Sequence, residues 1–314
     1  MSHSSAFQHQ PLDRTKSSLR LLTIRSNRSP KGLIKCRMWH DDVETIYTCL
    51  SYVWGSGNER HEIEINGRTF LVRQNLWDFL DVARKKYGDD QQAFWIDALC
   101  IDQDSLSERN HQVAQMGLIY SKADDVIAWL GFSEGIGRAF AFCNELNALK
   151  PATRTEAHKL WGREWSQTLS SDWFEFQSHQ YWTRAWITQE VLLARRLKIL
   201  VNDSEFDPSQ CSALRLLLPD INTDDVRYPS TVRGWSGSNA FNTYLQVACK
   251  KKIYEKKKLV DLFEELPRRQ CQIPRDQIYS LLSLASDTTS ISVDYGSSDE
   301  QFISHVLDTF EDSL

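Results

Sequence analysis

The fold is decided by Ile46-Tyr-Thr-Cys-Leu-Ser-Tyr-Val53, a run that ends at Trp54-Gly55. Its side chains are almost continuously apolar, which is typical of a short strand buried on both faces of a sheet, and the glycine after it indicates a turn. Two later runs, Ala93–Asp97 and Val126–Leu130, have a similar character. The three runs therefore predict three buried central strands.

Helical patterns separate these predicted strands. Asn75 is placed to cap a helix whose apolar residues recur three and four positions apart. Ser105 and Glu108 form a capping-box pattern before a second helix of the same kind. The order strand, helix, strand, helix, strand predicts an α/β fold, with a parallel sheet flanked by helices.

A β-hairpin is the strongest local signal in the sequence. Glu62–Ile65 and Arg68–Val72 alternate apolar and polar residues on either side of Asn66-Gly67. Asn-Gly favours the tight turn of a two-residue hairpin because both residues tolerate positive φ. We therefore expect two antiparallel strands here.

The rest of the chain divides by composition. Residues 1–20 are polar and lack periodicity, which predicts a mobile leader before a domain at 21–201. A single helix is expected from about 179 to 196. Residues 202–314 are expected to form a helical extension that packs on this domain. Its turn-rich first part, 202–242, gives no functional indication.

Composition excludes several classes of protein. The net charge of −5 provides no basic field for nucleic acid, and no apolar run reaches the length of a membrane span. The seven cysteines form no CxxC pair, and the eight histidines show no HExxH spacing, so neither a disulfide framework nor a metal centre is expected. The phosphate-binding pattern GxGxxG is absent. We expect a cytoplasmic protein with no cofactor, no bound metal, no nucleic-acid partner and no membrane span.

Three ordered blocks carry a resemblance to a known family. They are Leu50-Ser-Tyr-Val-Trp-Gly55, Trp95-Ile-Asp-Ala-Leu-Cys-Ile-Asp-Gln103 running on to Trp129-Leu-Gly131, and Arg184-Ala-Trp-Ile-Thr-Gln-Glu190. Together they resemble the fungal heterokaryon-incompatibility (HET) domain, over roughly residues 43 to 200. One departure is Asp102, where the family commonly has Asn. A looser echo occurs at Arg275–Leu282 and Asp294-Tyr295.

The resemblance implies both a fold and an activity. HET domains are similar to TIR domains, so it implies a TIR-like, flavodoxin-like sheet with helical insertions and a helical C-terminal portion. It also implies an effector of fungal non-self recognition that triggers programmed cell death and is controlled by self-association. Several TIR domains cleave NAD at the nicotinamide–ribose bond with one glutamate that follows a helix-borne Trp. Trp186 and Glu190 match that relation, which implies a catalytic role for Glu190 with NAD+ or NADP+ as substrate.

Cleavage of the nicotinamide–ribose bond depends on a negatively charged carboxylate more than on a proton donor. Nicotinamide leaves as a neutral molecule, so catalysis depends on stabilising the positive charge that develops on the ribose. Glu190 would supply that stabilisation if it faces a crevice at the edge of the sheet. The alternative interpretation is a structural ion pair between Glu190 and Arg109 or Arg184.

Other residues are candidates for binding the substrate. Ligands of open parallel sheets lie beyond the carboxyl ends of the strands, where this sequence places small, aromatic and charged side chains. These candidates are Ser51, Tyr52, Trp54, Gly55, Asp97, Arg109 and Trp186. Several of them also have a structural alternative, such as core packing for Trp54 and helix capping for Asp97.

Two further alternatives stay open at the level of the whole molecule. The same fold would also serve a non-catalytic adaptor that signals cell death through protein contacts. The chain is also compatible with being the effector part of a longer receptor. In either case we expect a homo-oligomer and an activating protein partner of unknown identity.

Overall fold

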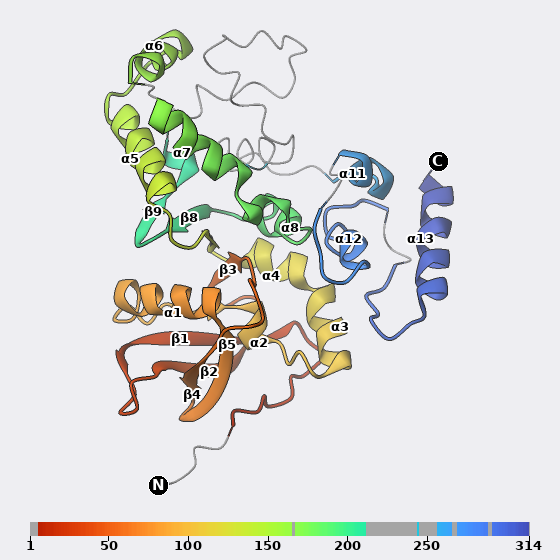
Figure 1. Ribbon diagram of the computed structural model, residues 1–314. Coiled ribbons are helices and arrows are strands. Elements are labelled where there is room, and N and C mark those ends of the chain that lie inside the picture. The colour runs from red at the N-terminus through yellow and green to blue at the C-terminus, as the bar shows by residue number, and fades with distance from the viewer. Residues whose placement is uncertain are drawn as a thin grey trace.

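The computed structural model describes residues 6–164, 167–211, 244, 256–265, 269–287 and 291–313. Within these ranges, nine strands form one sheet in the order β5-β4-β2-β1-β6-β3-β7-β8-β9 (Figure 1). The strands are β1 (Ser18–Arg28), β2 (Ile34–Asp42), β3 (Thr48–Tyr52), β4 (Arg60–Ile65), β5 (Arg68–Arg73), β6 (Phe94–Trp95), β7 (Asp125–Trp129), β8 (Leu197–Val201) and β9 (Ser204–Phe206).

The centre of the sheet is parallel, as the three apolar runs predicted. β3 pairs in parallel with β6 on one side and β7 on the other, and β7 pairs in parallel with β8. Counted in chain order, these four strands lie in the order 2-1-3-4, which begins the doubly wound order 2-1-3-4-5 of flavodoxin-like sheets. The α/β class is therefore confirmed.

The expectation of a parallel sheet was wrong for the rest of the sheet, which is mixed. β1 pairs antiparallel with both β2 and β6, β4 pairs antiparallel with β5, and β9 pairs antiparallel with β8. β1–β2, β4–β5 and β8–β9 are each joined by a short connection, which can only reverse the chain. β1 and β6 are far apart in the sequence, and β2 pairs in parallel with β4. The β1–β2 hairpin was not predicted from the sequence.

Helices cover both faces of the sheet (Figure 1). Their bounds are α1 (Gln74–Lys86), α2 (Asp97–Cys100), α3 (Leu106–Ala114), α4 (Met116–Lys122), α5 (Glu134–Ala148), α6 (Arg154–Glu164), α7 (Gln167–Ser178), α8 (Ile187–Leu192), α11 (Leu259–Glu265), α12 (Asp276–Tyr279) and α13 (Asp299–Ser313), with 3₁₀ helices η1 (Gln180–Thr183) and η2 (Pro208–Gln210). Figure 1 shows α11, α12 and α13 grouped beside α3, α4 and α8.

Two aromatic contacts show how α1 and α4 enclose the sheet. Phe79 of α1 packs edge-on against Phe94, and Tyr120 of α4 packs edge-on against Trp95. Phe94 and Trp95 are consecutive residues of β6, so their side chains point to opposite faces. All four are buried. The two helices therefore cover opposite faces of the parallel centre, as in a doubly wound fold.

The predicted turn is confirmed, but the predicted helix cap is not. Asn66 and Gly67 have φ of 50° and 80°, and they connect β4 to β5. Helix α1 begins at Gln74, so Asn75 lies inside it. The Asn75 side chain instead donates to the Val53 carbonyl at 2.6 Å and accepts from Trp129 Nε1 at 2.9 Å. It ties α1 to the ends of β3 and β7.

The expected single helix from 179 to 196 was wrong. The segment consists of η1, an extended Arg184 with ψ of 142°, and the short helix α8. A distant segment causes the break, because Gln270 N donates to the Thr183 carbonyl and Ala185 N donates to the Gln270 carbonyl. Tertiary pairing here overrides the helical pattern.

Contacts of the sheet extend across both positions at which domain boundaries were predicted. The expected leader at 1–20 includes the start of β1, and Phe7 N donates to the Thr69 carbonyl at 2.8 Å. At the other end, β9 joins the sheet beyond the boundary expected at 201. Much of the turn-rich stretch 202–242, from 212 onward, lies outside the described residues.

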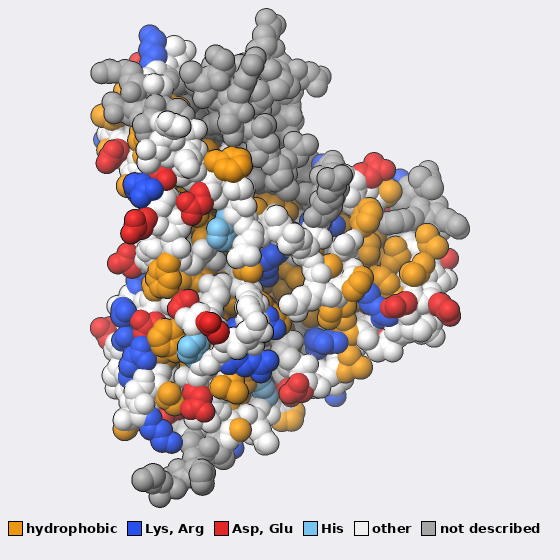
Figure 2. All heavy atoms as spheres, in the orientation of Figure 1, with side chains coloured by type: hydrophobic (Ala, Val, Ile, Leu, Met, Phe, Trp, Pro, Cys, Tyr) orange, Lys and Arg blue, Asp and Glu red, His pale blue; other side chains and the backbone are white. Residues whose placement is uncertain are grey.

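The surface carries charges of both signs. Figure 2 shows acidic and basic side chains interspersed over the face that contains β4, β5 and α1, with hydrophobic side chains gathered near α13. Ile303 and Leu307 of α13 are each 53% exposed. Within the described ranges, no helix combines the length and the apolar character that crossing a bilayer requires.

Candidate functional site

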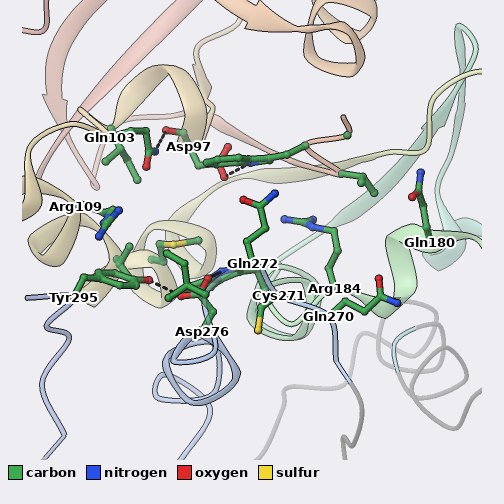
Figure 3. A pocket seen from close by; sticks show the side chains of 18 of the residues that line it. Asp97, Gln103, Arg109, Gln180, Arg184, Gln270, Cys271, Gln272, Asp276 and Tyr295 are labelled. Carbon is green, nitrogen blue, oxygen red and sulfur yellow. Dashed lines mark hydrogen bonds between the residues drawn. The ribbon is translucent and has the colours of Figure 1, made fainter. Parts of the chain in front are cut away.

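A pocket of about 710 Å³ opens beyond the carboxyl ends of β3 and β6. This is the position at which open parallel sheets bind ligands, and the volume lies in the range of small-molecule sites, about 300 to 1,000 Å³. Figure 3 shows the polar side chains around it. Aromatic, charged and amide groups share the lining, among them Trp54, Asp97, Arg109, Arg184, Trp186 and Gln272.

Asp97 provides a carboxylate at the pocket wall. It begins α2 directly after β6, and its Oδ2 accepts a hydrogen bond from Trp54 Nε1 at 2.9 Å while Oδ1 accepts from Ala98 N at 2.7 Å. Burial and the nearby charge of Glu190 raise the pKa of Asp97 to about 6, against the lowering effects of Arg184 and of these hydrogen bonds. Asp97 therefore changes its protonation state in mildly acidic solution.

Glu190 lies behind the pocket wall. Its side chain is only 2% exposed, and Arg184 Nη1 lies 3.3 Å from its Oε2. The same oxygen accepts a hydrogen bond from Ser51, whose hydroxyl is also 2.7 Å from the Tyr181 hydroxyl. Arg184 lines the pocket and Glu190 does not. The ion-pair alternative for Glu190 is thus confirmed, with Arg184 as the partner.

The C-terminal part of the chain forms the opposite wall. Asp276 of α12 accepts hydrogen bonds from Trp186 Nε1 at 3.1 Å and from the Tyr295 hydroxyl at 2.6 Å. The Tyr295 ring lies under Arg109, whose guanidinium carbon is 4.2 Å from the ring centre. Burial raises the pKa of Asp276, and the two hydrogen bonds partly oppose that rise. Residues far apart in sequence therefore complete one pocket.

The structure separates the predicted site residues into two groups. Trp54, Gly55, Asp97, Arg109 and Trp186 line the pocket. The second group, Ser51, Tyr52 and Glu190, lies buried behind it, with exposed fractions of 1%, 3% and 1%. The expected open position of Glu190 was based on a continuous helix, and the break at Arg184 turns its carboxylate inward instead.

Sequence reasoning missed the residues of the C-terminal wall. Gln270, Cys271, Gln272 and Ile273 line the pocket together with Asp276 and Tyr295. The looser echo at Arg275–Leu282 and Asp294-Tyr295 was the available signal, but nothing in it indicated which wall these residues form. The described residues contain no group of three His, Cys, Asp or Glu side chains placed to hold a metal ion.

The fold and the pocket together define a class. The chain is an α/β protein with a doubly wound parallel centre and a ligand-sized pocket at the carboxyl ends of its strands. Residues 47–190 match the family described as heterokaryon incompatibility protein (HET). The matched segment contains β3, β6 and β7 and every predicted site residue.

A curated relative supports the same family. Over 97 residues the chain is 36% identical to "Heterokaryon incompatibility protein 6, OR allele" of Neurospora crassa. The alignment covers 27% of this chain and 14% of that protein. No solved structure matches the chain.

Proposed function

We propose that this chain is a cytoplasmic effector of fungal heterokaryon incompatibility that triggers cell death by hydrolysing NAD+ or NADP+. The HET domain and the incompatibility protein of Neurospora crassa support the biological role. The 2-1-3-4 order of the parallel strands is in keeping with the TIR-like fold that the family resemblance implies. The proposed bond is the one between nicotinamide and ribose.

The pocket is the observation that carries this proposal. It combines aromatic rings that can stack on a base, a cation that can bind phosphate and carboxylates that can accept ribose hydroxyls, all at the carboxyl ends of parallel strands. We assign contacts with the dinucleotide to Trp54, Gly55, Asp97, Arg109 and Trp186. Ser51 and Tyr52 support the site from behind.

The reaction consumes one water molecule. The bond between C1′ of the ribose and the nicotinamide nitrogen breaks, its electron pair goes to nicotinamide, and water oxygen bonds to C1′. The water proton is released to solvent, so the products are nicotinamide, ADP-ribose (or its 2′-phosphate) and a proton. A carboxylate beside the ribose stabilises the positive charge that builds up during this step.

Glu190 can act as that carboxylate only if Arg184 moves. Arg184 lines the pocket, and its Nη1 and Nη2 donate to Oε2 and Oε1 of Glu190 at 3.3 and 3.5 Å. The phosphate oxygens of a bound dinucleotide compete with Glu190 for Arg184. If Arg184 binds them instead, the Glu190 carboxylate becomes available to the ribose. We propose that self-association or an activating protein partner favours the same rearrangement.

The burial of Glu190 favours a second candidate function. A carboxylate 1% exposed and bound to Ser51 and Arg184 is typical of a structural pair. In a non-catalytic adaptor this pair would fix α8 against the sheet, and cell death would be signalled through protein contacts.

Nicotinamide release separates the two functions. Purified protein is incubated with NAD+ or NADP+ at dilute and concentrated protein, and nicotinamide is measured by chromatography. We expect release by the wild type and a loss of about 100-fold or more in Glu190→Gln, because a charge-stabilising carboxylate contributes on that order. Asp261→Asn, an exposed carboxyl change in α11, is the matched control. Absence of turnover at every concentration would refute the hydrolase and leave the adaptor.

A further inference from the structure

Arg109 lines the pocket without an ion-paired carboxylate among the described residues. Among the described residues, its guanidinium forms no ion pair, and its buried Nε has no hydrogen-bond partner. By contrast, several buried or half-buried arginines bind a carboxylate directly: Arg20 binds Glu108, Arg184 binds Glu190 and Arg275 binds Asp299. A guanidinium in a pocket wall that is not paired with an anion can donate charge-assisted hydrogen bonds to an anionic ligand.

The position of Arg109 is fixed by its own helix and by a residue of the C-terminal part of the chain. It lies in α3, whose first turn is capped by Ser105. The ring of Tyr295 supports its guanidinium at 4.2 Å, and that ring is held by the bond from its hydroxyl to Asp276 and by Asn110, which accepts from Tyr295 N at 3.1 Å. Stacking covers the face of a guanidinium but leaves its in-plane N–H groups free to donate.

The charges around the pocket point to an anion at Arg109. Figure 3 places Arg109 and Arg184 on opposite sides of the pocket, with Gln272 between them. Arg184 is neutralised by Glu190, whereas Asp276 acts on Arg109 through its charge alone, because both of its oxygens bind Trp186 and Tyr295. An incoming anion therefore meets an available donor at Arg109.

We propose that Arg109 binds a phosphate group of the ligand, and that the Tyr295 ring from the C-terminal segment holds it in place. The choice of a nucleotide phosphate rests on the proposed function, since that proposal supplies the ligand class. The pocket is then incomplete without residues 270–273, Asp276 and Tyr295, which lie outside the HET match at 47–190. Arg109 contacts the ligand, and Tyr295 is a positioning residue.

Calorimetric binding to the full chain tests this proposal with ADP-ribose, ADP and adenosine as probes. We expect Arg109→Gln to lower the affinity for ADP-ribose and for ADP by roughly 10- to 100-fold, which is the contribution of hydrogen bonds to a charged group. The affinity for adenosine should not change. The affinity of the wild type for ADP-ribose should also fall with added salt more steeply than that of the variant. Arg37→Gln, at an exposed position of β2 away from the pocket, is the matched control.

Variants of Tyr295 distinguish positioning from mere folding. Tyr295→Phe keeps the stacking ring but loses its bond to Asp276, so it should weaken the binding of ADP-ribose less than Tyr295→Leu does. Tyr295→Leu should weaken the binding of ADP-ribose several-fold and leave the binding of adenosine unchanged. A purely structural role would lower the affinity for all three probes together.

Three results would overturn the proposal. They are unchanged ADP-ribose affinity in Arg109→Gln, an equal loss of adenosine and ADP-ribose, and a wild type that binds neither ADP-ribose nor ADP. Nicotinamide release is a separate measurement. If ADP-ribose binds through Arg109 but NAD+ is not cleaved, the anion site stands and the hydrolase fails.

Discussion

Two carboxylates at the site have different environments. Asp97 lines the pocket and has a raised pKa, whereas Glu190 is sealed behind Arg184 and Ser51. The residue types at both positions could be read from the sequence, and so could their placement near strand ends. Their exposure could not, because it depends on the break at Arg184 that residue 270 imposes.

Asp97 should make stability depend on pH. Its pKa of about 6 in the folded protein lies above the value of 3.8 expected when unfolded, so the native state holds more protons between these values. The free energy of unfolding therefore falls as pH rises from about 4 to about 6, by about 1 to 3 kcal/mol. Urea unfolding of the wild type and Asp97→Asn across this range measures the difference. Curves that stay parallel would show that the pKa of Asp97 is not raised.

Elements formed by local sequence were predictable, and elements formed by distant contacts were not. The β4–β5 hairpin follows from Asn66-Gly67, and β3 and β7 follow from their apolar runs. Helix α8 and the C-terminal wall depend instead on the pairing of Gln270 with the chain around Arg184. No pattern within either segment indicates such a partner.

The contact between α4 and the C-terminal part can be tested at Gly117. A Cβ at this position would lie 2.2 Å from Cβ of Ser283, so Gly117→Ala forces the two segments apart. We expect a loss of about 1 to 3 kcal/mol in the free energy of unfolding. Thermal unfolding of Gly117→Ala, Ser283→Gly and the double variant measures the coupling.

Relief of the clash should make the double variant more stable than Gly117→Ala alone. Ser283→Gly by itself loses the bond from its hydroxyl to Gln189 and costs about 1 kcal/mol. Additive losses in the double variant would mean that α4 does not pack closely on residue 283.

At the scale of the whole molecule, the segment that matches the HET family and the C-terminal part build one site. The matched segment supplies β3, β6 and β7 with Trp54, Asp97 and Arg109, and the C-terminal part supplies Asp276 and Tyr295. The family resemblance predicted the domain and its sheet centre, but it did not predict that the pocket needs a second segment.

A crystal structure with a non-cleavable carbocyclic analogue of NAD+ tests the central claim most directly. The account predicts the analogue in the pocket between Trp54 and Arg109, a phosphate on Arg109, and Arg184 turned away from Glu190 toward the ligand. An analogue bound elsewhere, or an intact Arg184–Glu190 pair that still separates the carboxylate from the ribose, would contradict it.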